Sequence, residues 1–193
     1  MSLDDQVRWD KQHADSVKTG QPSSFLREVV ENDFWEIPRG RALDIACGQG
    51  RNALFLAERG FDVVAIDVSP VALREGQQQA NGKPLTITWQ QADLESIALP
   101  EERFDVVINF KYLQRSLMPQ LKAAVKRGGF FIFETFLIDQ QTIGHPSNPD
   151  YLLRHNELLN DCRDLRVLFY REGKFRDASS APSFRAGILA QKN

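Results

Sequence analysis

The stretch Arg41-Ala42-Leu43-Asp44-Ile45-Ala46-Cys47-Gly48-Gln49-Gly50-Arg51-Asn52 decides the fold class of this chain. Apolar residues on both sides of Asp44 predict a buried strand, and a helical pattern begins at Asn52. Between them, Gly48 and Gly50 allow a tight turn and a close approach of the backbone to a ligand. A strand that passes through such a turn into a helix is typical of a doubly wound α/β fold that binds an adenosine cofactor.

Apolar runs and helical patterns alternate along the rest of the chain, which predicts βαβ units and a parallel sheet. The closing pair of apolar runs predicts an antiparallel hairpin at the C-terminal end. We therefore expect an α/β, Rossmann-like, mostly parallel seven-stranded sheet with that hairpin at its edge. The expected strands are 42–46, 63–66, 85–89, 106–110, 130–137, 165–171 and 184–190, and the expected helices are 22–34, 52–59, 70–80, 113–126 and 157–162.

The 193 residues fit one domain. Within it we expect an N-terminal helical cap or lid at 1–36, a cofactor-binding core at 37–137, and an acceptor loop with the closing hairpin at 138–193. The polar segment 139–149 contains Gly, His and Pro residues and follows the strongest apolar run, so we expect a functional loop there.

Composition narrows the class of partner. A hydrophobic fraction of 42% and a charged fraction of 26% are typical of a globular protein. A net charge of −2 gives no general attraction to nucleic acid or to anionic lipid. No apolar run approaches the ~20 residues of a membrane span, and the two cysteines offer neither a disulfide framework nor a metal-ligand spacing. We expect a cytoplasmic monomer or homodimer that binds no metal, nucleic acid or membrane.

The glycine pattern fits two adenosine cofactors, NAD and S-adenosylmethionine. The carboxylates near it distinguish between them. Gly48-x-Gly50-x-x-Ala53 also matches the NAD fingerprint, but Asp44 beside the turn would repel a pyrophosphate. The same carboxylate favours the sulfonium and ammonium groups of S-adenosylmethionine. Asp67 ends the second strand, where it could accept from ribose hydroxyls, and Asp93 follows the third strand, where it could accept from the adenine amino group.

This set of residues resembles the class I S-adenosylmethionine-dependent methyltransferases, and the resemblance covers roughly 41–136. The run Asp44-x-x-Cys47-Gly48-x-Gly50-Arg51-Asn52 and the pair Trp9-Asp10 are similar to the small branch of tellurite-resistance and thiopurine-methyltransferase-like proteins. The resemblance implies S-adenosylmethionine as cofactor and S-adenosylhomocysteine as product. It implies cofactor contacts from Asp44, Ala46, Cys47, Gly48 and Gly50 at the methionine end, Asp67 and Val68 at the ribose, Asp93 and Leu94 at the adenine, Asn109 and Phe110 from the fourth strand, and Trp9 as a lid.

Methyl transfer is an in-line displacement, so no catalytic base is strictly required. The family motif for methylating nucleic-acid bases places two prolines after the fourth strand, where this chain has Asn109-Phe110-Lys111-Tyr112. We therefore expect a small-molecule acceptor. Tyr112 is our candidate for orienting the acceptor and His145 for accepting its proton, although His145 could instead have only a loop role.

The sequence leaves several questions about the site and the function open. Lys111 is a second candidate acceptor contact, and the polar pair Glu134-Thr135 inside an apolar strand fits a site role as well as a structural one. The function itself has two alternatives, an NAD-binding oxidoreductase and a catalytically silent S-adenosylmethionine-binding protein. The closing hairpin favours a methyltransferase over the oxidoreductase, because a dinucleotide fold would add a sixth parallel strand instead. The acceptor atom is undetermined among thiol, amine, carboxylate, oxyanion and metalloid.

Overall fold

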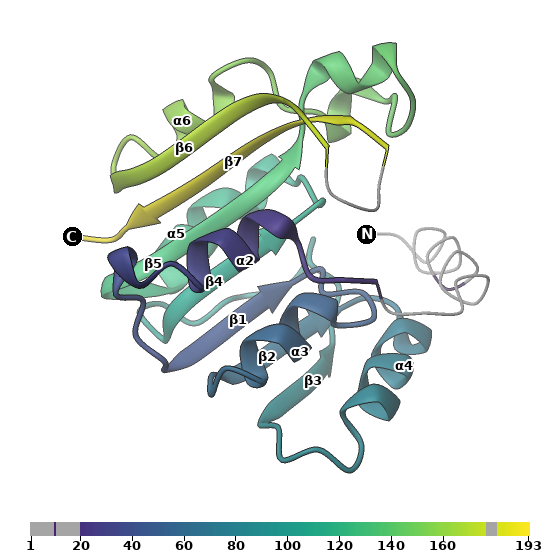
Figure 1. Ribbon diagram of the computed structural model, residues 1–193, viewed down its shortest axis with the longest axis vertical. Coiled ribbons are helices and arrows are strands. Elements are labelled where there is room, and N and C mark those ends of the chain that lie inside the picture. The colour runs from purple at the N-terminus through teal and green to yellow at the C-terminus, as the bar shows by residue number, and fades with distance from the viewer. Residues whose placement is uncertain (1–9, 11–19, 177–180) are drawn as a thin grey trace.

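A seven-stranded sheet forms the centre of the computed structural model, which describes residues 10, 20–176 and 181–193. The strand order is β3-β2-β1-β4-β5-β7-β6 (Figure 1). Strands β1 to β5 are parallel, and β7 lies antiparallel between β5 and β6. This confirms the predicted fold class, including its closing hairpin. The strands are β1 Arg41–Ile45, β2 Asp62–Asp67, β3 Ile87–Gln91, β4 Phe104–Phe110, β5 Val125–Phe136, β6 Arg166–Phe175 and β7 Ser183–Gln191.

Helices cover both faces of the sheet, as the doubly wound topology requires. In Figure 1, α2 and α3 lie in front of the strands and α5 and α6 lie behind them. The α-helices are α2 Ser24–Val30, α3 Arg51–Ala57, α4 Pro70–Ala80, α5 Met118–Ala124 and α6 Glu157–Asp161. Short 3-10 turns are η1 Asp33–Trp35, η2 Arg115–Leu117, η3 Ile138–Thr142 and η4 Pro149–Tyr151.

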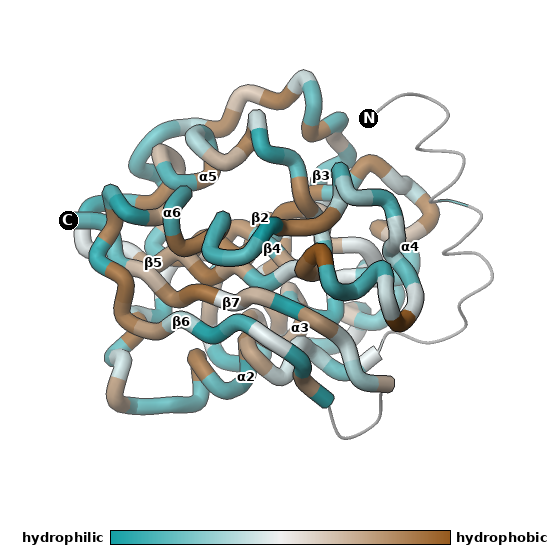
Figure 2. Tube along the Cα trace, turned by 90° about the horizontal axis from the view of Figure 1, so that it is seen from above, coloured by the Kyte–Doolittle hydropathy of each residue, from teal (hydrophilic) through white to brown (hydrophobic). Residues whose placement is uncertain are grey.

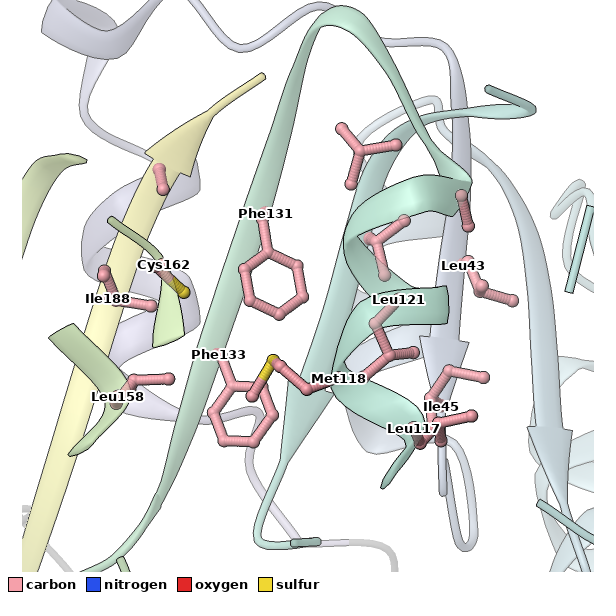
Figure 3. Packing of buried hydrophobic residues seen from close by; sticks show 14 of the residues in the cluster. Leu43, Ile45, Leu117, Met118, Leu121, Phe131, Phe133, Leu158, Cys162 and Ile188 are labelled. Atoms are coloured by element: carbon pink, nitrogen blue, oxygen red, sulfur yellow. The ribbon is translucent and has the colours of Figure 1, made fainter. Parts of the chain in front are cut away.

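Each face of the sheet has its own hydrophobic cluster, because successive side chains of a strand point to opposite faces. On β1, Leu43 and Ile45 join the cluster under α5 and α6, whereas Ala42 joins the cluster under α2 and α3. Figure 3 shows the first cluster, to which β5 contributes Phe131 and Phe133 and α5 contributes Met118. The central strands are therefore apolar on both faces, which matches the near-continuous apolar runs in the sequence.

Hydrophilic residues gather in the connections around these strands (Figure 2). Within the part of the chain that the structure describes, no helix is both long and apolar enough to cross a membrane.

Several predicted element boundaries were wrong, among them the following three. The helix expected over 22–34 is the shorter α2, and the Ser23 hydroxyl does not cap it. The helix expected over 113–126 ends at Ala124, because Val125 already pairs with Phe104 as the first residue of β5. The third strand begins at Ile87 instead of residue 85.

Candidate functional site

The turn between β1 and α3 lies at the carboxyl edge of the parallel strands. Ala46, Gly48 and Gly50 all have a positive φ, of 52°, 56° and 75°. The Cys47 amide donates to the Ile66 carbonyl over 3.0 Å, which ties the turn to β2. A Cβ on Gly50 would lie 2.2 Å from the indole ring of Trp89, so the turn accepts only glycine at that position.

Asp67, at the end of β2, fixes this turn through hydrogen bonds to backbone amides. Its Oδ2 accepts from the Gly48 amide over 2.7 Å and its Oδ1 accepts from the Ser69 amide over 2.9 Å. The side chain is buried. A carboxylate oxygen can accept more than one hydrogen bond, so fixing the turn does not by itself exclude contact of Asp67 with a ligand.

Asp44 is the other buried acid of the turn. Burial raises the pKa of its carboxyl to about 8; nearby Arg51 opposes the increase, Asp67 adds to it, and a hydrogen bond from the Ala53 amide also opposes it. Its Oδ2 has no hydrogen-bond partner among the residues that the structure describes. A buried carboxyl with an unsatisfied oxygen beside a glycine turn is a fitting site for a cationic or hydrogen-bond-donating group of a ligand.

A second unsatisfied oxygen lies on the neighbouring strand. Asn109 pairs in register with Ile45 across β1 and β4, is buried, and its Oδ1 lacks a hydrogen-bond partner within the described part of the chain. Phe110, Val68 and Leu94 are also buried, whereas Asp93 is only half-buried and accepts from the Glu95 amide over 2.9 Å.

Cys47 lies in the same turn but is poorly suited to act as a nucleophile. Burial raises the pKa of its thiol well above the usual value, and the nearby carboxyls of Asp44 and Asp67 raise it further. The thiolate is the reactive form, so burial leaves this thiol unreactive.

The two candidate catalytic residues lie in different surroundings. His145 lines a cavity of about 810 Å³, together with Lys111, Phe136 and Arg185. Tyr112 is not among the residues that line this cavity, and its hydroxyl donates to Gln114 Oε1. Tyr112 packs instead against the cluster on the α5 side of the sheet.

Trp9, the expected lid, lies outside the described residues. Asp10 beside it is described, and its carboxylate accepts a hydrogen bond from the hydroxyl of Ser69, the N-cap residue of α4.

The structure adds a buried polar network around Glu134 of β5. Glu134 accepts from the Ser23 hydroxyl over 3.2 Å, from Arg171 Nη2 over 2.9 Å and from Arg185 Nη1 over 3.2 Å. The Ser23 amide in turn donates to Asn52 Oδ1 over 3.0 Å, which joins the network to α3. The sequence drew attention to Glu134, but it gave no signal for these partners, which lie far away along the chain.

Comparisons with known proteins agree with this geometry. Residues 42–129 match a family model described as a methyltransferase domain. Hemagglutinin 1 of Eikenella corrodens is 28% identical over 158 residues, which cover 77% of this chain and 50% of that protein. A ubiquinone biosynthesis O-methyltransferase of Cereibacter sphaeroides is 32% identical over 100 residues, which cover 49% of this chain and 40% of that protein.

Among solved structures, TehB from Haemophilus influenzae superposes with a TM-score of 0.74 at 21% identity, over 97% of this chain and 67% of that one. This likeness shows the fold. The chain spans half or less of the length of the two curated relatives above. The family match is thus to a methyltransferase domain over residues 42–129, and the glycine turn between Asp44 and Asp67 lies inside the matched region.

Proposed function

We propose that this chain transfers the methyl group of S-adenosylmethionine to a small-molecule acceptor. The observation that carries the proposal is the pair of buried acids around the turn, Asp44 with an unsatisfied oxygen and Asp67 bonded to the Gly48 amide. Asp44 would hold a cationic group at the methionine end, and Asp67 would hold the ribose hydroxyls.

The alternative cofactor, NAD, fits this turn less well. Its pyrophosphate would gain nothing from the charged form of the Asp44 carboxyl, whereas a cationic group would stabilise that form. The position of β7 between β5 and β6 also differs from the sixth parallel strand of a dinucleotide fold.

The chain's own residues would bind the cofactor, orient the acceptor and exclude water from both. The bound cofactor supplies an electrophilic methyl group on a sulfonium centre. Leu94 and Phe110, both buried, would keep water from the cofactor. Asn109 would offer a donor its carbonyl oxygen, which has no partner among the described residues. His145 would accept the acceptor's proton where one is released, whereas Tyr112 lies outside the cavity that His145 lines and packs on the α5 side of the sheet.

We also propose that residues 138–193, together with Lys111, form the acceptor side of the protein. His145 and Arg185 come from this part of the chain and line the same cavity as Lys111. The cofactor acids all come from the segment before it.

Calorimetric titration with S-adenosylmethionine, S-adenosylhomocysteine and NADH tests the proposal. We expect the first two to bind and NADH not to bind. A panel of thiols, amines, phenols and carboxylic acids would then be screened for release of S-adenosylhomocysteine. Binding without turnover on every acceptor class would favour a silent binding protein, and tighter binding of NADH would favour an oxidoreductase.

A further inference from the structure

Gln140 lies in the 3-10 turn η3, in the loop that follows β5, and its side chain is buried. Its Nε2 donates to the His145 carbonyl over 3.0 Å, and its Oε1 accepts from the Phe184 amide over 2.8 Å. The ladder between β5 and β7 ends at the pair Phe136 and Arg185, so Phe184 is the next residue of β7 beyond it. The Gln140 side chain therefore ties the loop, at His145, to the start of β7.

The backbone of Gln140 holds the same loop. Its carbonyl accepts from the amides of Ile143 and Gly144, each over 3.1 Å. Within the described part of the chain, every hydrogen bond of residues 143–147 is made with Gln140. His145 is exposed and lines the 810 Å³ cavity, so packing does little to hold it. Its place at the cavity therefore depends largely on Gln140.

We infer that Gln140 is a positioning residue for methyl transfer, which holds His145 at the cavity where that histidine would accept a proton. This inference rests on the proposed function and adds a residue to the same site. Gln140 also lines the cavity, so a direct contact with the acceptor is the competing explanation. A positioning residue acts only while His145 is present, whereas a direct contact acts without it.

Gln140→Glu separates the two ends of the side chain. The variant keeps an acceptor for the Phe184 amide, but it replaces the donor to His145 by a second acceptor oxygen. Two acceptor oxygens then face each other, and the loop must move at His145. Gln140→Met removes both hydrogen bonds without adding a buried charge, and it gives the same readouts if the glutamate variant folds poorly.

The matched control is Gln141→Glu. It makes the same chemical change one residue further along the turn, where the side chain is exposed and outside the cavity lining. Any effect of the added negative charge that does not pass through the bond to His145 should appear in both glutamate variants.

The first measurement needs neither cofactor nor acceptor, because it records the ring signals of the histidines by NMR. The chain has three, His13, His145 and His155, and the variants His145→Ala and His155→Ala assign their signals. We expect the His145 signal to move toward the position of histidine in an unstructured peptide in both Gln140 variants. It should stay in place in Gln141→Glu. An unchanged His145 signal in both Gln140 variants would overturn the inference.

The second measurement is a double-mutant cycle on the rate of methyl transfer. Gln140→Glu should lower this rate by about tenfold, while the affinity for S-adenosylhomocysteine stays within about threefold. In a His145→Ala background the same change should alter the rate by no more than about twofold. A further tenfold loss in that background would overturn the inference in favour of a direct contact. Failure of S-adenosylhomocysteine to bind would instead refute the proposed function, while the histidine signals would still show whether Gln140 holds His145.

Discussion

If Asp44 binds the cofactor as proposed, the protonation of its buried side chain is coupled to cofactor binding. Its pKa of about 8 lies above the ordinary value of 3.8, so the folded protein without cofactor carries a proton there at pH 7. A cationic cofactor group beside the carboxyl would lower this pKa, and binding would then release the proton. We expect the affinity for S-adenosylmethionine to rise with pH up to about 8, by at most about tenfold per pH unit.

Calorimetry across this pH range, on the wild type and on Asp44→Asn, measures the effect. The variant should bind more weakly, and its affinity should lack the part of the pH dependence that Asp44 causes. Titration of the cofactor's own amine affects both proteins and cancels in the comparison. Identical pH profiles for the two proteins would show that Asp44 does not face the cofactor's charge.

The Asp44 carboxyl should also affect folding stability, but here a rise in pH lowers the free energy of unfolding instead of favouring binding. Because the pKa in the folded state is raised, the folded protein binds more protons than the unfolded chain between pH 4 and 8, and the free energy of unfolding falls as pH rises through this range. Asp44→Asn should therefore increase the melting temperature of the protein without cofactor, and this increase should be larger at pH 8 than at pH 5.

Asp67 has two roles that its structure makes inseparable. Asp67→Ala removes the proposed acceptor for ribose hydroxyls and also the acceptor for the Gly48 and Ser69 amides. We expect the affinity for S-adenosylhomocysteine to fall by more than about tenfold, since each charge-assisted hydrogen bond contributes ~1.5–3 kcal/mol. Asp62→Ala is the control, because Asp62 lies at the opposite end of β2 and pairs with Arg41 over 3.5 Å. Unchanged binding in Asp67→Ala would remove Asp67 from the site.

At the scale of elements, the Trp89 side chain of β3 limits the space for a side chain at Gly50, in the turn between β1 and α3. A Cβ at Gly50 would lie 2.2 Å from Trp89 Cη2, and Gly50 has a φ of 75°. Gly82 has a nearly identical φ of 74° but no atom within 4 Å of such a Cβ. The two glycines therefore separate backbone strain from a steric clash.

We expect Gly82→Ala to cost about 1 kcal/mol of unfolding free energy, from the positive φ alone. Gly50→Ala should cost clearly more, and it should also weaken binding of S-adenosylhomocysteine because the turn must move. Chemical denaturation and calorimetry measure these two quantities. Equal stability losses in the two variants would mean that Trp89 moves aside without cost.

Local patterns predicted most elements, but not their ends. The strand and turn around Asp44 were predicted because apolar residues and glycines occur there in an order that few other structures share. The start of β5 was not, because Val125 belongs to a continuous helical pattern in the sequence and becomes part of a strand only through pairing with Phe104. Likewise Ser23 has the sequence features of a helix cap, but its hydroxyl bonds to Glu134 instead.

At the scale of the whole molecule, the parallel topology explains why part of the site was predictable. Once β1 and β2 are parallel neighbours, Asp44 and Asp67 must meet at their carboxyl ends. The Glu134 network follows no such rule. Its partners Ser23 and Arg185 lie 111 and 51 residues away along the chain, and only the packing of α2 and β7 against β5 brings them together.

The same topology separates the cofactor acids from the proposed acceptor side, so cofactor binding and methyl transfer should respond to different variants. His145 lines the cavity together with Lys111, whereas Asp44 and Asp67 surround the glycine turn. We expect His145→Ala to lower the rate of methyl transfer by about tenfold or more while the affinity for S-adenosylhomocysteine stays within about threefold. The control is His155→Ala, since His155 is exposed and pairs with Asp139 outside the cavity lining.

The two measurements are the rate of S-adenosylhomocysteine release with an accepted substrate and the affinity for S-adenosylhomocysteine by calorimetry. A fall in affinity equal to the fall in rate would place His145 on the cofactor, and equal rates for both histidine variants would remove it from the acceptor site.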